Sequence, residues 1–180
     1  KYVRAYATGT YRTKPARLQD AINDLRSLPM RGSFLDVSCG YGDVIREAKA
    51  LGFEPCHGTE IIDPLCDGLM VTKAWCHHLP FGDKIFDVAT MLDVIEHLVP
   101  GDDELACREV ARVTRCHIIL TANNRPSRNH IGEDLHINKR PYDEWDHLFR
   151  TWFASARVTW LKEGRNDRGP FASSAWRIDL

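Results

Sequence analysis

One stretch near the first third of the chain decides the fold: Leu35-Asp36-Val37-Ser38-Cys39-Gly40-Tyr41-Gly42. An apolar run over residues 33–38 leads into it, and a helical pattern of apolar residues follows as far as Leu51. Glycine permits positive φ and a close approach of backbone to ligand, so Gly40 and Gly42 suit a tight turn. Free N–H groups at a helix start can receive a carboxylate. The stretch therefore predicts a strand, a turn and a helix around a ligand site.

Strands and helices alternate along the rest of the chain, which is typical of α/β proteins. We expect helices over residues 15–28, 102–114 and 142–153, and strands over residues 33–38, 53–61, 69–75, 85–92 and 116–122. Two further extended segments, residues 156–161 and 174–180, have no helix between them and predict an antiparallel hairpin. The expected fold is a Rossmann-like, doubly wound sheet of seven strands. It is mostly parallel with a C-terminal antiparallel hairpin, and helices cover both faces.

Length and composition indicate a single globular domain. The chain has 180 residues, enough for one core and too few for two ordinary domains. We divide it into an N-terminal arm and helix (1–32), a cofactor-binding core (33–123), and an acceptor-side loop, helix and terminal hairpin (124–180). Hydrophobic residues make up 43%, charged residues 27%, and the net charge is -1, so neither a membrane nor a polyanion is indicated overall.

The cysteines and the chain start bear on the compartment. The six cysteines occur singly, without the spacing of a disulfide framework or a zinc knuckle, so we expect reduced thiols. The longest apolar runs fall far short of the roughly 20 residues that a membrane helix needs. With no signal-like segment at the start, we expect a cytoplasmic protein and no membrane contact.

A carboxylate stands where a nucleotide fold uses one. Glu60 ends the second expected strand, 20 residues after Gly40. In open parallel sheets, ligands bind beyond the carboxyl ends of the strands, where an acid accepts hydrogen bonds from ribose hydroxyls. A dinucleotide fold would have a third glycine where this chain has Ile45, and Asp36 precedes the turn here. The pattern favours a different nucleotide cofactor.

Further motifs follow the turn in order. They are Gly58-Thr59-Glu60, Leu79-Pro80-Phe81, Phe86-Asp87-Val88 and Asp93-Val94-Ile95-Glu96-His97-Leu98. Together with the turn, this series resembles the class I S-adenosylmethionine-dependent methyltransferases of the ubiquinone-biosynthesis type. The resemblance covers residues 34–123 and implies S-adenosylmethionine as the cofactor and S-adenosylhomocysteine as the product.

The resemblance also implies which residues hold the cofactor. The turn would wrap the methionine part through Asp36, Ser38, Cys39, Gly40 and Gly42. Glu60 would bind the ribose and Ile61 would pack on the adenine, which Cys76 and His77 would flank. Leu92 and Asp93 would lie under the methionine chain.

Two residues depart from the family pattern. Ser38 stands where the family usually has glycine, and serine is small enough to be tolerated. Trp75 stands where many relatives carry an aspartate that helps to recognise the adenine amino group. These departures motivate one alternative hypothesis, a module that binds the cofactor without catalysis.

Methyl transfer from a sulfonium needs mainly alignment and a dry site, because the donor is already activated. A hydroxyl acceptor must in addition lose its proton, and histidine is suited to accept it. His97, at the end of the loop after the fourth strand, and His136, in the loop after the fifth, are our candidate catalytic residues. We therefore predict methyl transfer to a hydroxyl or nitrogen of a small or mid-sized acceptor.

A second hypothesis involves a metal. Asp93, Glu96, His97 and His136 form an oxygen and imidazole set that could hold a divalent cation. This arrangement resembles the small-RNA 3′-terminal 2′-O-methyltransferases, which implies a metal-assisted enzyme with RNA as its partner. Metal-free small-molecule methyltransferases have the same Glu-His-Leu motif and later histidine, so we assign no metal ligand and prefer a small-molecule acceptor.

Basic residues gather in residues 1–17 and again in the loop over residues 123–141. They could frame an anionic acceptor or simply be solvated. The aromatic residues Trp145, Phe149 and Trp152 recur at helical spacing, so we expect them in the core rather than in a base-stacking surface.

Overall fold

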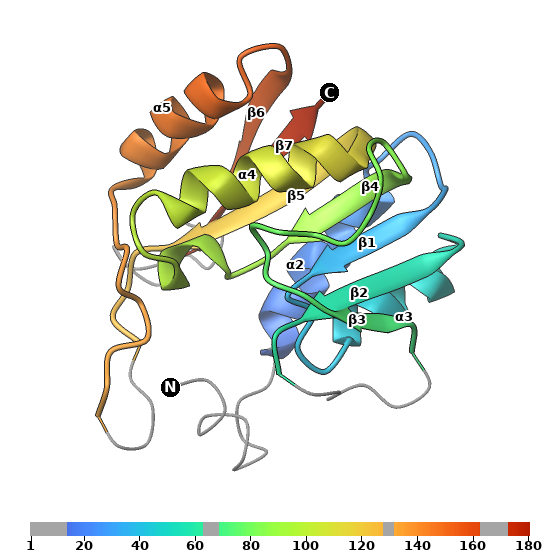
Figure 1. The fold of residues 1–180 in the computed structure, drawn as a ribbon, viewed down its shortest axis with the longest axis horizontal. Coiled ribbons are helices and arrows are strands. Elements are labelled where there is room, and N and C mark those ends of the chain that lie inside the picture. Colours follow the sequence, from blue (N-terminus) through green and yellow to red (C-terminus); the bar gives the residue numbers. More distant parts are fainter. Residues whose placement is uncertain (1–13, 63–68, 128–131, 163–172) are drawn as a thin grey trace.

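The computed structural model describes residues 14–62, 69–127, 132–162 and 173–180. These residues form one seven-stranded sheet in the order β3-β2-β1-β4-β5-β7-β6 (Figure 1). The strands are β1 (Phe34–Val37), β2 (Cys56–Glu60), β3 (Val71–Lys73), β4 (Phe86–Met91), β5 (Thr114–Asn123), β6 (Arg157–Lys162) and β7 (Ser173–Asp179). All neighbouring pairs from β3 to β5 are parallel, whereas β7 is antiparallel to both β5 and β6. The predicted fold class and its terminal antiparallel pair are confirmed.

Helices cover both faces of the sheet (Figure 1). They are α2 (Pro15–Arg26), α3 (Asp43–Ala50), α4 (Asp102–Val113), α5 (Tyr142–Trp152) and the short 3₁₀ helix η1 (Ile95–His97). Side chains alternate along each strand, so neighbouring residues enter different cores. Phe34 packs with Val88 and Ile45 in the core under α2 and α3. Leu35 packs with Trp145 in the larger core under α4 and α5.

Several strand ends differ from the expected ones. The second strand begins at Cys56 rather than at residue 53, because Pro55 has no N–H to donate to a neighbouring strand. Its carbonyl oxygen still accepts a hydrogen bond from the N–H of Phe34. The third strand shrinks to Val71–Lys73, since it pairs with β2 alone at the sheet edge. The fifth strand is longer than expected because both neighbours, β4 and β7, pair along it.

The described cysteines form no disulfide bond, as expected, and Cys66 lies outside the described residues. Among the described helices, none has the length and apolar character needed to cross a membrane. Trp145 and Phe149 are fully buried, which confirms that this aromatic face of α5 belongs to the core.

Candidate active site

The strand order reverses at β1, which lies between β2 and β4. Ligands of open α/β sheets bind at this point, beyond the carboxyl ends of the strands. A cavity of about 770 Å³ lies there, within the range of cofactor pockets. It is lined by all the predicted site residues except Gly42, namely Asp36, Ser38, Cys39, Gly40, Glu60, Ile61, Cys76, His77, Leu92, Asp93, His97 and His136.

The turn after β1 is built from left-handed residues. Ser38, Gly40 and Gly42 have φ values of 58°, 53° and 73°. Gly42 is the N-cap of α3, so it shapes the turn without lining the cavity. Ser38 adopts a conformation that favours glycine, at a modest cost in strain.

Glu60 ties this turn to the end of β2. The side chain is buried, with 4% of its surface exposed. The N–H of Gly40 donates to Oε2 over 2.9 Å, and the N–H of Ile61 donates to Oε1 over 2.8 Å. A carboxylate oxygen accepts more than one hydrogen bond, so Glu60 can also accept bonds from ribose hydroxyls.

Asp36 is a buried acid at the same end of the cavity. Burial raises the pKa of its carboxyl to about 7, against the effect of a hydrogen bond from Thr90, and the negative charge of Glu60 raises it further. The Thr90 hydroxyl donates to Asp36 Oδ1 over 2.7 Å. Bound positive charge would favour the ionised form, so this acid suits a cationic ligand.

Asp93 follows β4 and turns toward α2. Its φ is 54°, and its N–H donates to the Thr121 hydroxyl over 2.7 Å. Arg17 of α2 forms an ion pair with the Asp93 carboxylate. The guanidinium of Arg17 therefore lies inside the same cavity, beside the groups that follow β4.

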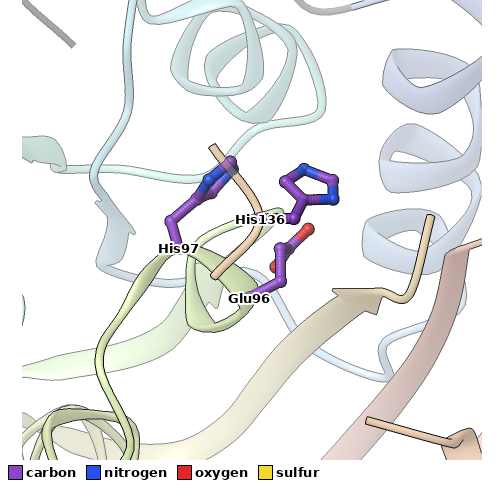
Figure 2. Close-up of side chains that lie close together, drawn as sticks. All are labelled: Glu96, His97 and His136. Atoms are coloured by element: carbon purple, nitrogen blue, oxygen red, sulfur yellow. The ribbon is translucent and has the colours of Figure 1, made fainter. Parts of the chain in front are cut away.

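Three further groups converge on one point: Glu96 and His97 of η1, and His136 of the loop before α5 (Figure 2). One potential ligand atom from each residue lies within 4.8 Å of the other two. The two imidazole rings are 4.6 Å apart between centroids at an angle of 74°. Glu96 is fully buried, and within the described part of the chain neither of its carboxylate oxygens accepts a hydrogen bond.

Backbone carbonyls orient both imidazole rings. Nδ1 of His97 is 2.9 Å from the Leu135 oxygen, and Nδ1 of His136 is 2.5 Å from the Arg125 oxygen. A carbonyl only accepts, so each Nδ1 carries the proton and the lone pair is on Nε2. This arrangement is how proteins commonly fix a metal-binding or proton-accepting histidine.

The environment favours the neutral form of all three groups. Burial raises the pKa of Glu96 to about 8, while the positive charge of Arg17 lowers it. Burial lowers the pKa of His97 to about 4, although its hydrogen bond to Leu135 acts in the opposite direction. Burial likewise lowers the pKa of His136. Both imidazoles can therefore accept a proton or bind a cation near neutral pH.

Comparison with known proteins decides the family. Residues 35–117 match the family model described as a methyltransferase domain. This chain carries a class I S-adenosylmethionine-dependent methyltransferase domain. S-adenosylmethionine is accordingly its cofactor. The ubiquinone-biosynthesis subtype stays a prediction.

Solved structures share the fold of this methyltransferase at low identity. The PH0226 protein of Pyrococcus horikoshii OT3 is 18% identical, with 99% of this chain and 97% of that chain covered and a TM-score of 0.72. A 1,6-didemethyltoxoflavin-N1-methyltransferase of Burkholderia thailandensis, with S-adenosylhomocysteine bound, is 15% identical. The match covers 99% of this chain and 84% of that chain, with a TM-score of 0.74. The methyltransferase domain of a bacterial Hen1 is 16% identical, with 92% of this chain and 98% of that chain covered and a TM-score of 0.67. No curated protein sequence matches this chain.

Arg17 and Asp102 are among the cavity residues of the methyltransferase that the sequence did not single out. Arg17 was grouped with the solvated basic segment, and only the docking of α2 brings it to Asp93. Asp102 opens α4 and lines the cavity, although an acid at a helix start is ordinary. No local sequence pattern marks either residue as part of the site, because both reach it only through tertiary packing.

The basic loop predicted near the acceptor is largely structural in its described part. Lys139 pairs with Asp134, and Arg140 pairs with Asp103. Arg125 does line the cavity. Residues 128–131 of this loop and residues 1–13 of the basic arm lie outside the described residues.

Proposed function

We propose that this methyltransferase methylates a hydroxyl group, and that Glu96, His97 and His136 hold a divalent cation beside that hydroxyl. The buried Glu96 carboxylate carries the proposal, because it has no hydrogen-bond partner among the described residues and lies beside two oriented imidazoles. An unsatisfied buried carboxylate is costly, and a missing ion is a usual explanation. Two imidazole nitrogens and a carboxylate oxygen are ligands that suit divalent transition metals. This proposal changes our sequence prediction, which assigned no metal ligand.

The residues that would hold the cofactor lie along the cavity. The turn over residues 38–42 and the acids Asp36 and Asp93 suit the methionine part with its positive charges. Glu60 suits the ribose hydroxyls. His97 and His136 line the same cavity, which supports an acceptor hydroxyl beside them.

The reaction requires one bond to form and one to break. The acceptor oxygen attacks the methyl carbon, the carbon–sulfur bond breaks, and its electron pair returns to sulfur to give S-adenosylhomocysteine. Burial lowers the pKa of both rings, so each is neutral and would hold the cation through Nε2, and the hydroxyl proton would leave to water. A cation at this cluster would lower the pKa of the hydroxyl, which makes proton loss easier.

Two classes of acceptor carry such a hydroxyl. The first class is a small or mid-sized phenol or sugar. The toxoflavin-precursor methyltransferase from Burkholderia thailandensis, with its acceptor bound, supports this class because it shares the fold. The Glu96, His97 and His136 cluster also favours a second candidate, the terminal 2′-hydroxyl of RNA.

The test is transfer of radiolabelled methyl from S-adenosylmethionine to panels of phenols, sugars and short RNAs, with and without chelator. We expect transfer to a hydroxyl acceptor that the chelator abolishes and Mn²⁺ restores. Loss of the cation predicts a decrease on the order of 100-fold or more in Glu96→Gln. Glu104→Gln, at an exposed carboxylate that bonds Arg108, is the matched control.

Methyl acceptors that lack the reacting hydroxyl distinguish a small-molecule acceptor from an RNA acceptor. An RNA ending in 2′-deoxyribose should be inert if RNA is the acceptor. Transfer that is equally fast with chelator would refute the cation. Cofactor binding without transfer to any acceptor would favour the non-catalytic module.

A further inference from the structure

The cavity has two ends of different character. Asp36 and Asp93 are acidic groups at the methionine end. Ile61 follows Glu60 directly, and β3 pairs with β2 at Lys73 and Glu60, so the apolar side chains of Ile61 and Trp75 lie on the Glu60 side of the cavity. Because Glu60 marks the ribose, the uncharged purine of the cofactor belongs at this apolar end.

Trp75 is the exposed aromatic residue of this end. Its side chain is 60% exposed, while its ring stacks on His77 at 5.8 Å between centroids and 26° between planes. The stack is fixed by a tight turn in which the N–H of His78 donates to the Trp75 oxygen. A purine packed against the indole would remove apolar surface from water, and such stacking is sequence-tolerant because every base has a π-face.

Trp75 cannot read the exocyclic group of adenine. The 6-amino group needs a hydrogen-bond acceptor, and the indole offers only a donor. Glu60 accepts hydrogen bonds from Gly40 and Ile61, and its remaining capacity is assigned to the ribose hydroxyls. Asp102, the first residue of α4, lines the same cavity, and its negative charge acts on Cys76, the neighbour of Trp75.

Asp102 and Glu60 both lie near Cys76. Cys76 is buried, and the pKa of its thiol is raised to about 11, chiefly by burial and further by the negative charges of Asp102 and Glu60. Asp102 is half-buried, and its carboxylate has no hydrogen-bond partner among the described residues. The Asp102 carboxylate can therefore accept a hydrogen bond from a ligand in the cavity.

We infer that Trp75 packs against the purine of S-adenosylmethionine and that the Asp102 carboxylate accepts a hydrogen bond from its 6-amino group, so that these residues set the specificity for adenine. The inference concerns the cofactor and does not depend on the acceptor or on a cation. A cofactor with an oxo group in place of the amino group would present an acceptor to the carboxylate. That contact is repulsive and leaves the carboxylate unpaired.

The test is calorimetric binding of S-adenosylhomocysteine and S-inosylhomocysteine to the full chain. We expect the wild type to prefer the adenosyl compound by about 10- to 100-fold, since an unpaired group costs about 1–3 kcal/mol. Asp102→Ala should reduce this preference to about 3-fold or less. Glu104→Ala, two residues along the same helix with its side chain outside the cavity, should leave the preference unchanged.

Tryptophan fluorescence tests the packing separately. S-adenosylhomocysteine should change the emission of the wild type and of Glu104→Ala, but not that of Trp75→Phe. Trp75→Phe should keep the affinity within a few-fold, whereas Trp75→Ala should lose about 10-fold or more.

Three results would overturn the inference. One is equal binding of the two compounds by the wild type, and another is a preference that survives in Asp102→Ala. The third is an emission change that persists in Trp75→Phe. If the folded wild type bound neither compound, the assignment of the cofactor would fall with the inference.

Discussion

At the scale of single residues, the sequence predicted the groups that belong to local motifs. The turn over residues 38–42 was predictable because positive φ favours glycine, and Glu60 because it ends a strand at a fixed place in this fold. Arg17 and Asp102 were not predictable, because α2 and α4 must dock before they reach the cavity. A cation site at Glu96, His97 and His136 was one of the alternatives that the sequence left open. One potential ligand atom of each residue lies within 4.8 Å of the other two, which favours this alternative.

The raised pKa of Asp36 predicts a pH-dependent loss of stability. The pKa is about 7 in the folded protein and 3.8 in the reference state, so the folded chain retains a proton that the unfolded chain releases between these values. Stability then falls as the pH rises from about 4 to 7. Asp36→Asn should remove about 4 kcal/mol of this pH-dependent loss of unfolding free energy.

Urea unfolding at pH 4 and pH 8 measures this difference. The variant should gain stability over the wild type at pH 8 and only little at pH 4. Parallel pH profiles for the two proteins would contradict a buried, protonated Asp36.

At the scale of elements, the sequence predicted types and order better than ends. The alternation of apolar residues located all the strands, but the extent of β3 and β5 depends on how many neighbours each strand pairs with. The loop that carries His136 has no periodic pattern, so its path was not predictable. Asn138 makes two of the contacts that hold that loop: its N–H donates to the Glu96 oxygen over 3.0 Å, and its side-chain amide donates to the buried Asp103 over 2.8 Å.

Asn138→Ala tests whether this loop positions His136. Loss of the side-chain bond to Asp103 loosens the loop without removing any of the three proposed ligands. We expect Mn²⁺ affinity to fall by about 10-fold, as for other residues that orient a ligand, while the affinity for S-adenosylhomocysteine stays unchanged. Calorimetry with each ligand measures both. Ile137→Ala, at an exposed neighbour in the same loop, should change neither, and an equal loss there would show that the loop responds to any substitution.

At the scale of the whole molecule, the sheet brings distant segments to one cavity. Residues from α2, the β1 turn, the end of β2, η1 and the loop before α5 line it together. The central claim is that one cavity holds S-adenosylmethionine and a cation side by side. The sequence predicted the first half from ordered motifs, whereas the second half depends on the packing of η1 against a loop about 40 residues later, His97 to His136.

The most direct measurement is magnetic resonance of S-adenosylmethionine, isotopically labelled in its methyl group, on the protein titrated with Mn²⁺. Paramagnetic broadening falls steeply with distance from the ion. The account predicts that the methyl signal broadens much more than the adenine signals, and that Glu96→Gln loses this difference while still binding the cofactor. A methyl signal that Mn²⁺ leaves sharp, or that broadens equally in Glu96→Gln, would contradict a cation at Glu96, His97 and His136.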